Sequence, residues 1–178
     1  MGKLIVVRHG ETNYNAEGRY AGRIDIGLNE KGHEQAKALA KELKNTSIDI
    51  IISSTLKRAT ETAAIIGDEL QLPVIEMSEL VEKGVGVYEG LTREEAKKKY
   101  PVMWERNAPE GAETVEEVEN RVYNALNTIR YDYLNNKNVL IVAHGYVTKV
   151  ISKYFNNSSQ EAFSKYVLKN CEYDEYSV

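Results

Sequence analysis

Two histidines and two arginines of this 178-residue chain come shortly after short apolar runs, which would let them act together on one ligand. An arginine guanidinium is a permanently charged fork of donors that matches the oxygens of a phosphate group. A neutral imidazole nitrogen is a nucleophile that can attack phosphorus, and a second imidazole can donate to the oxygens that gain charge during transfer. The residues are Arg8 and His9 after the run at 4–7, Arg58 after the run at 48–52, and His144 after the run at 139–143.

Smaller residues beside these side chains complete a predicted phosphate pocket. Gly10 lets the backbone approach a ligand closely, and Asn15 adds a neutral donor within reach of the same loop. The two guanidiniums disfavour protonation of both imidazoles in the empty pocket, and a bound phosphoryl group reverses that balance. The predicted phosphate-binding residues are Arg8, Arg58, Asn15 and Gly145.

Phosphoryl transfer from an ester also needs an acid for the leaving oxygen, and Glu79, Glu82 and Glu89 are the candidates. Glu82 precedes Lys83-Gly84, so its carboxyl is the one best suited to a turn held close to a ligand. It would act first as a general acid and then as a general base toward water. Local spacing alone leaves the choice among the three glutamates open.

The three apolar runs are short and largely β-branched, as in strands that are covered by helices on both faces. Segments with apolar residues at helical spacing alternate with them, and Thr114 with Glu117 fits a capping box. The pattern predicts an α/β protein, a three-layer α/β/α sandwich with a mostly parallel central sheet. Ligands of such sheets bind beyond the carboxyl ends of the strands, where the histidines and arginines fall. The predicted helices are 34–44, 55–70, 93–99 and 114–134.

The chain has the length of one ordinary domain, and we predict a single domain over 1–178. The glycine-rich and irregular segment at about 74–111 is predicted to form a cap over one end of the sheet. The stretch 166–178 is a candidate for an edge strand.

Composition excludes several other classes of protein. With 42% hydrophobic and 28% charged residues the chain is too apolar to be disordered, and no stretch is apolar enough to span a membrane. A net charge of -4 argues against a nucleic-acid partner.

One cysteine and no visible signal peptide predict a cytoplasmic protein. We expect no cofactor and no metal, because no Cys or His-carboxylate spacing supports a metal site. The oligomeric state is left open, and a homodimer is one possibility. The third histidine, His33, is expected to be exposed to solvent.

Arg8-His9-Gly10-Glu11-Thr12 with Asn15 resembles the signature of the histidine phosphatase superfamily, the phosphoglycerate mutase-like proteins. The resemblance implies that His9 is the nucleophile that forms a phosphohistidine and that Glu82 is the proton donor. It also implies that His144 shares the phosphate pocket with the two arginines, and that the substrate is a small-molecule phosphomonoester. Further ordered segments that resemble the family are 22–36, 53–63, 80–90, 109–114 and 142–145.

The resemblance leaves two enzyme activities and one binding activity to weigh. Mutases of the family are usually longer, with an insertion after the proton-donor segment, and only eighteen residues separate Glu82 from Pro101 here. We therefore expect the phosphatase branch, with a cofactor-dependent phosphoglycerate mutase as the alternative. A non-catalytic phospho-ligand binder is disfavoured because His9, His144 and Glu82 are all present. Tyr88 stands where tryptophan is common, which leaves the substrate open.

Overall fold

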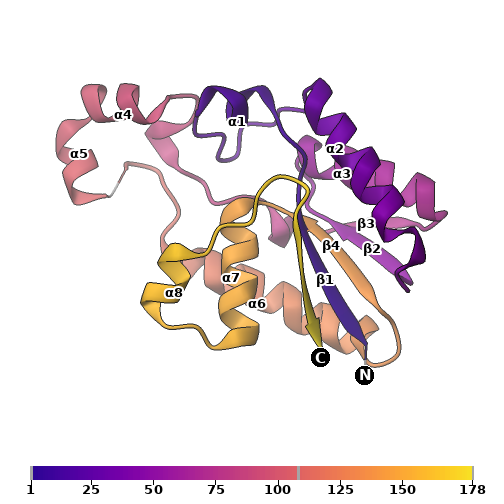
Figure 1. The fold of residues 1–178 in the computed structure, drawn as a ribbon. Helices are drawn as coiled ribbons and strands as arrows, with labels where there is room; N and C mark the ends of the chain where they lie inside the picture. The colour runs from indigo at the N-terminus through magenta and orange to yellow at the C-terminus, as the bar shows by residue number, and fades with distance from the viewer. Residues whose placement is uncertain (1, 108, 178) are drawn as a thin grey trace.

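A five-stranded sheet in the order β3-β2-β4-β1-β5 forms the centre of the molecule in the computed structural model, which describes residues 2–107 and 109–177 (Figure 1). The three predicted strands are its central strands, and they run parallel to one another. The edge strand predicted in 166–178 is present as β5, which pairs antiparallel with β1. The strands are β1 (Lys3–Arg8), β2 (Ile50–Ser53), β3 (Val74–Glu76), β4 (Val139–Ala143) and β5 (Tyr173–Ser177).

Helices cover both faces of the sheet, so the predicted three-layer sandwich is confirmed. Successive residues of β1 point to opposite faces: Ile5 and Val7 pack with α2 and α3, and Leu4 and Val6 pack with α6 and α7. Each buried Ile, Leu or Val side chain contributes about 1.5–3 kcal/mol relative to exposure, so these two layers of side chains hold the strand ends in place. The helices concerned are α2 (Glu30–Glu42), α3 (Lys57–Leu70), α6 (Val115–Ile129) and α7 (Gly145–Asn156).

A side-chain cap moves the start of one helix away from its predicted position. Asn29 accepts a hydrogen bond from the Gly32 amide, so α2 begins at Glu30 and not at residue 34. The capping box of Thr114 and Glu117 starts α6 as predicted, and the helix then passes into a π-helical turn at Arg130–Leu134. The predicted helix at 93–99 is α4 (Arg93–Lys99).

The segment 74–111 begins with β3 and continues through 3-10 turns at Ser78–Leu80 and Gly86–Tyr88. Figure 1 shows α4 and α5 (Pro101–Arg106) side by side in a lobe at one end of the molecule. Helix α8 (Gln160–Lys165) packs on α7, and α1 (Asn13–Glu17) follows the loop after β1. No helix in the described part of the chain is long and apolar enough to cross a membrane.

Candidate active site

The two predicted catalytic histidines lie next to each other beyond the carboxyl ends of neighbouring strands. Their ring centroids are 5.1 Å apart, with the ring planes tilted by 57°. Parallel pairing of β1 with β4 sets Arg8 opposite Ala143, so the residue after each strand, His9 and His144, comes to the same edge of the sheet. Both imidazoles are buried, with 3% of His9 and none of His144 exposed. His33, in contrast, is exposed as predicted.

A backbone hydrogen bond fixes the tautomer of His9. Its Nδ1 donates to the Gly10 carbonyl oxygen at 2.7 Å, which leaves the lone pair on Nε2. Burial lowers the pKa of His9 well below its ordinary value, and the charge of Arg58 lowers it further. The neutral imidazole therefore presents an unprotonated Nε2, the form that acts as a nucleophile.

Ser54 orients the second imidazole. The Ser54 hydroxyl lies 2.7 Å from His144 Nε2 and accepts a hydrogen bond from the Leu56 amide, so its own hydrogen is free to donate to Nε2. When the hydroxyl donates to Nε2, the ring hydrogen is on Nδ1, which is buried and has no hydrogen-bond partner among the described residues. Burial lowers the pKa of His144 well below its ordinary value, with further lowering by its charged neighbours.

Both predicted arginines are held through their terminal nitrogens by backbone carbonyls. Arg58 donates to the carbonyl oxygens of Ile24 and Gly22, each at 2.8 Å, and Arg8 donates to that of Leu168 at 2.8 Å. The Nε atoms of both guanidiniums are buried and have no partner in the described part of the chain. Because buried donors normally have a partner, Nε of both arginines and Nδ1 of His144 together suit a ligand rich in acceptor oxygens.

Asn15 is brought to the same site by α1. Its Oδ1 accepts from the Thr12 amide at 3.1 Å and from Asn170 Nδ2 at 3.3 Å, so its own amide nitrogen is the side-chain donor that remains. Asn170 also donates to the His9 carbonyl oxygen at 2.8 Å, which ties the C-terminal segment to the nucleophile loop. The predicted donor thus lies beside the loop, as expected.

Close backbone packing explains the glycines of the site. A β-carbon on Gly10 would lie 2.6 Å from the Gly32 carbonyl oxygen, so the loop after β1 rests directly on the first turn of α2. The Gly10 amide donates to Thr62 Oγ1 at 3.0 Å. A β-carbon on Gly145 would lie 3.5 Å from Arg8 Nε, so the first residue of α7 borders the guanidinium.

The structure distinguishes the three candidate glutamates, and Glu82 is the one whose carboxylate acts on both site arginines. Glu82 Oε1 accepts from the Lys83 amide at 2.8 Å, and Oε2 accepts from the Tyr146 amide at 3.3 Å, in the first turn of α7. Glu79 is exposed and bonds to Ser78, and Glu89 accepts from the amides of Arg23 and Val85. Burial raises the pKa of Glu82 and outweighs two backbone hydrogen bonds and the charges of the site arginines.

Arg121 holds the backbone that carries Glu82. Its guanidinium donates to the carbonyl oxygens of Glu79, Val81 and Glu82 at 2.7, 2.6 and 3.2 Å. It also forms a two-pronged ion pair with Glu113, at 2.9 and 3.0 Å. Because five hydrogen bonds converge on one side chain, the position of the Glu82 turn depends on α6, the helix that carries Arg121.

Sequence reasoning missed several residues that position the site. Ser54 and Thr62 lie within a segment that resembles the family, but nothing in the sequence assigned them a partner. Asn170 and Arg121 had no local signal at all, because Asn170 is 161 residues from His9 and Arg121 is 39 residues from Glu82.

The α/β sandwich brings two buried imidazoles and two guanidiniums together at its strand ends, an arrangement that suits a ligand rich in acceptor oxygens. Residues 4–178 match the model of the histidine phosphatase superfamily (branch 1). The chain belongs to this superfamily, and the predicted family is confirmed.

Named relatives include phosphatases and mutases. The chain is 37% identical over 171 residues to "Uncharacterized phosphatase PhoE" of Bacillus subtilis (strain 168), covering 96% of this chain and 86% of the relative. It is 39% identical over 151 residues to "Phosphoserine phosphatase 1" of Hydrogenobacter thermophilus, covering 81% and 71%. A "2,3-bisphosphoglycerate-dependent phosphoglycerate mutase 2" of Gloeobacter violaceus is 31% identical over 188 residues, covering 96% and 83%.

The fold also matches solved structures over its whole length. Bacillus stearothermophilus YhfR superposes with a TM-score of 0.91 at 29% identity, covering 100% of this chain and 92% of the other. Family, fold and phosphatase-named relatives together bear out the predicted enzyme class, a phosphoric monoester hydrolase.

Proposed function

We propose that the chain hydrolyses a small phosphomonoester through a phosphohistidine on His9. The observation that carries this proposal is the pairing of an unprotonated His9 Nε2 with three buried, unpartnered donors among the described residues. These donors, Arg8 Nε, Arg58 Nε and His144 Nδ1, would bind the phosphoryl oxygens, with Asn15 and the amide of Gly145 as further donors. The net charge of -4 therefore coexists with a positive pocket.

In the first step the lone pair of His9 Nε2 attacks phosphorus, and the ester P–O bond breaks. The Glu82 carboxyl, which its raised pKa keeps protonated to higher pH, gives its proton to the leaving alcohol oxygen. His144 and the arginines neutralise the charge that develops on the phosphoryl oxygens. The products are a phosphohistidine, the free alcohol and a Glu82 carboxylate.

In the second step a water molecule attacks the phosphohistidine. The Glu82 carboxylate takes a proton from the water, whose oxygen bonds to phosphorus as the P–N bond breaks. Inorganic phosphate leaves, His9 regains its lone pair and Glu82 is again protonated. One carboxyl group therefore serves both half-reactions.

Rapid quenching in base after mixing with a radiolabelled phosphomonoester tests the covalent step. We expect a base-stable, acid-labile label on the protein that is lost in His9→Ala. His33→Ala, which alters an exposed histidine of α2, is the matched control and should keep both label and turnover. Full turnover by His9→Ala would refute the mechanism. Binding of phosphate without turnover of any ester would favour a non-catalytic binder instead.

The mutase alternative is distinguished by where the phosphoryl group goes. A panel of O-phosphoserine, 3-phosphoglycerate, fructose 2,6-bisphosphate, α-ribazole phosphate and 4-nitrophenyl phosphate should release inorganic phosphate from at least one ester. Formation of 2-phosphoglycerate from 3-phosphoglycerate, faster than phosphate release, would assign a mutase.

Location in a reducing compartment such as the cytoplasm fits the single cysteine, Cys171.

A further inference from the structure

A cavity of about 660 Å³ is lined by two residues whose backbones contact Glu82. Lys83 and Tyr146 line it, and their backbone amides are the two that bind the Glu82 carboxylate. The cavity wall therefore starts one residue away from the proposed proton donor. On our proposed function, this is the space that the non-phosphoryl part of a substrate would occupy.

Aromatic side chains form much of the wall. Tyr88 is only 4% exposed and packs against Tyr20 and Trp104. Its ring centroid lies 5.8 Å from that of Tyr20 and 6.1 Å from that of Trp104. Tyr146 meets Phe163 of α8 edge to face at 5.9 Å. Such a wall suits a flat, largely apolar body, because apolar and π-stacking contacts dominate small-molecule sites.

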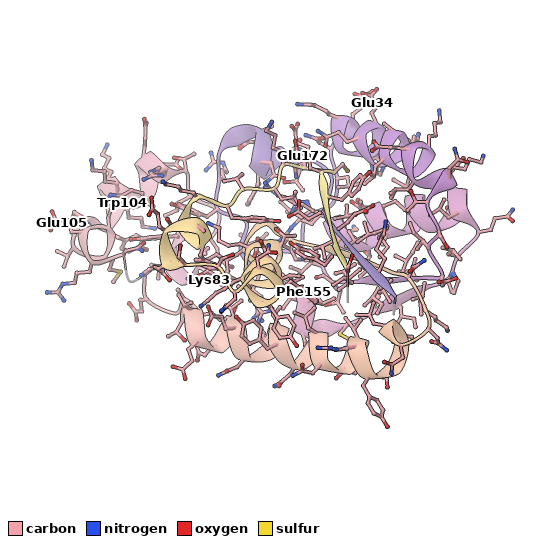
Figure 2. The ribbon with its side chains drawn as sticks, turned by 60° about the horizontal axis from the view of Figure 1, so that its bottom comes forward. Glu34, Lys83, Trp104, Glu105, Phe155 and Glu172 are labelled. Carbon is pink, nitrogen blue, oxygen red and sulfur yellow. The ribbon has the colours of Figure 1, made fainter. Side chains whose placement is uncertain are left out.

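Two cations line the cavity, and none of the described residues that line it carries a carboxylate. Lys83 Nζ lies 4.7 Å from the centre of the Tyr146 ring, and the Arg93 guanidinium lies 5.1 Å from that of Trp104. Neither cation forms an ion pair within residues 2–107 and 109–177. Figure 2 places Lys83 and Trp104 on the same side of the molecule, toward the α5 lobe. The cavity thus joins an aromatic surface to two cations, and the carboxylates that act on Lys83, those of Glu82 and Glu113, lie outside its lining.

We propose that the preferred substrate carries a carboxylate on an aromatic leaving group, and that Lys83 and Arg93 bind this carboxylate. The inference rests on the proposed function and adds the class of substrate. Volume argues against a three-carbon acid such as serine or glycerate as the best leaving group, because cavities of roughly 300–1,000 Å³ hold much larger ligands. Charge complementarity argues against a neutral or cationic one.

A matched pair of esters isolates the charge. 4-(Phosphonooxymethyl)benzoate and 4-(phosphonooxymethyl)benzamide share ring, shape and benzylic alcohol, and differ in one negative charge. We expect kcat/KM to be about tenfold higher for the benzoate, since each tenfold step needs only about 1.4 kcal/mol. The benzoate should also exceed O-phosphoserine by about tenfold or more.

The double variant Lys83→Met/Arg93→Met should bring the benzoate to benzamide ratio to about 1, and each single variant should lower it partway. Lys98→Met removes an exposed cation of α4 that does not line the cavity, and should leave the ratio unchanged. It controls for long-range charge, which acts without contact.

Several outcomes would overturn the inference. The first is an equal kcat/KM for the two esters. The second is a tenfold benzoate to benzamide ratio that persists in the double variant. The third is a higher kcat/KM for O-phosphoserine than for the benzoate. If the enzyme hydrolyses 4-nitrophenyl phosphate but neither benzylic ester, the inference is also wrong, while the proposed function stands. If it hydrolyses none of the esters and His9 carries no label, the proposed function itself is refuted.

Discussion

Glu82→Gln separates proton donation from phosphate binding. The Lys83 amide bonds to one oxygen of this carboxylate at 2.8 Å, and the Tyr146 amide bonds to the other at 3.3 Å. The side-chain oxygen of a glutamine can still accept the shorter bond from the Lys83 amide, but its nitrogen cannot accept the longer bond from the Tyr146 amide. We therefore expect a loss of about 1 kcal/mol or less in the free energy of unfolding, the net worth of one hydrogen bond.

The chemical loss should be far larger and should depend on the leaving group. General acid catalysis contributes about 100- to 10,000-fold, or about 2.7–5.4 kcal/mol, to a reaction whose leaving oxygen needs a proton. We expect kcat on an alkyl ester such as O-phosphoserine to fall by that factor. 4-Nitrophenyl phosphate should lose less than about tenfold, because nitrophenolate leaves without a proton.

The pH profile gives an independent measurement. Burial raises the pKa of Glu82, so the acid form persists below that raised value and is lost as the pH rises through it. For the wild type, kcat/KM on the alkyl ester should therefore decline on the alkaline side, and Glu82→Gln should remove this decline. Glu79→Gln, an exposed neighbour, is the control and should change neither rate nor profile. Equal losses on both esters, or an unchanged profile, would refute Glu82 as the proton donor.

Three further changes test the structure around the site. Ser54→Ala leaves Nε2 of the buried His144 without its hydroxyl, and should lower kcat/KM about 5- to 150-fold, equivalent to about 1–3 kcal/mol, in steady-state assays. Burial raises the pKa of Glu113, but its hydrogen bonds and ion pairs outweigh this and lower it to about 2. Its stabilising effect is thus complete above its unfolded pKa and is lost as the pH falls toward 2. Urea titrations should show that Glu113→Gln removes roughly 2–3 kcal/mol of acid-dependent stability over that range. Gly10→Ala would force a β-carbon against the Gly32 carbonyl oxygen, and should cost roughly 1–3 kcal/mol in urea unfolding together with activity.

The elements that carry strong local signals were predicted correctly. Runs such as 139–143 are continuously apolar because helices bury both faces of the strand, and this pattern is visible without the fold. Thr114 and Glu117 began α6 where predicted, because a capping box is formed by residues three apart. Helices α1, α5, α7 and α8 were not predicted from sequence, nor was β3, which has only three residues. Helices α1, α5 and α8 and strand β3 have at most six residues each, so tertiary packing decides them. Helix α7 has twelve residues, and its apolar residues Val147, Val150 and Ile151 recur at helical spacing, so the sequence held a local signal that the prediction did not use.

The sequence by itself determined that two imidazoles and two guanidiniums reach one edge of a parallel sheet. It could do so because strand ends are read from local hydrophobicity, and parallel strands end on the same side. Only the tertiary structure decided which glutamate joins them, and that Ser54, Asn170 and Arg121 hold them in place. Those contacts join residues from 39 to 161 positions apart. No local pattern encodes such pairs, because their geometry exists only once sheet and helices have packed.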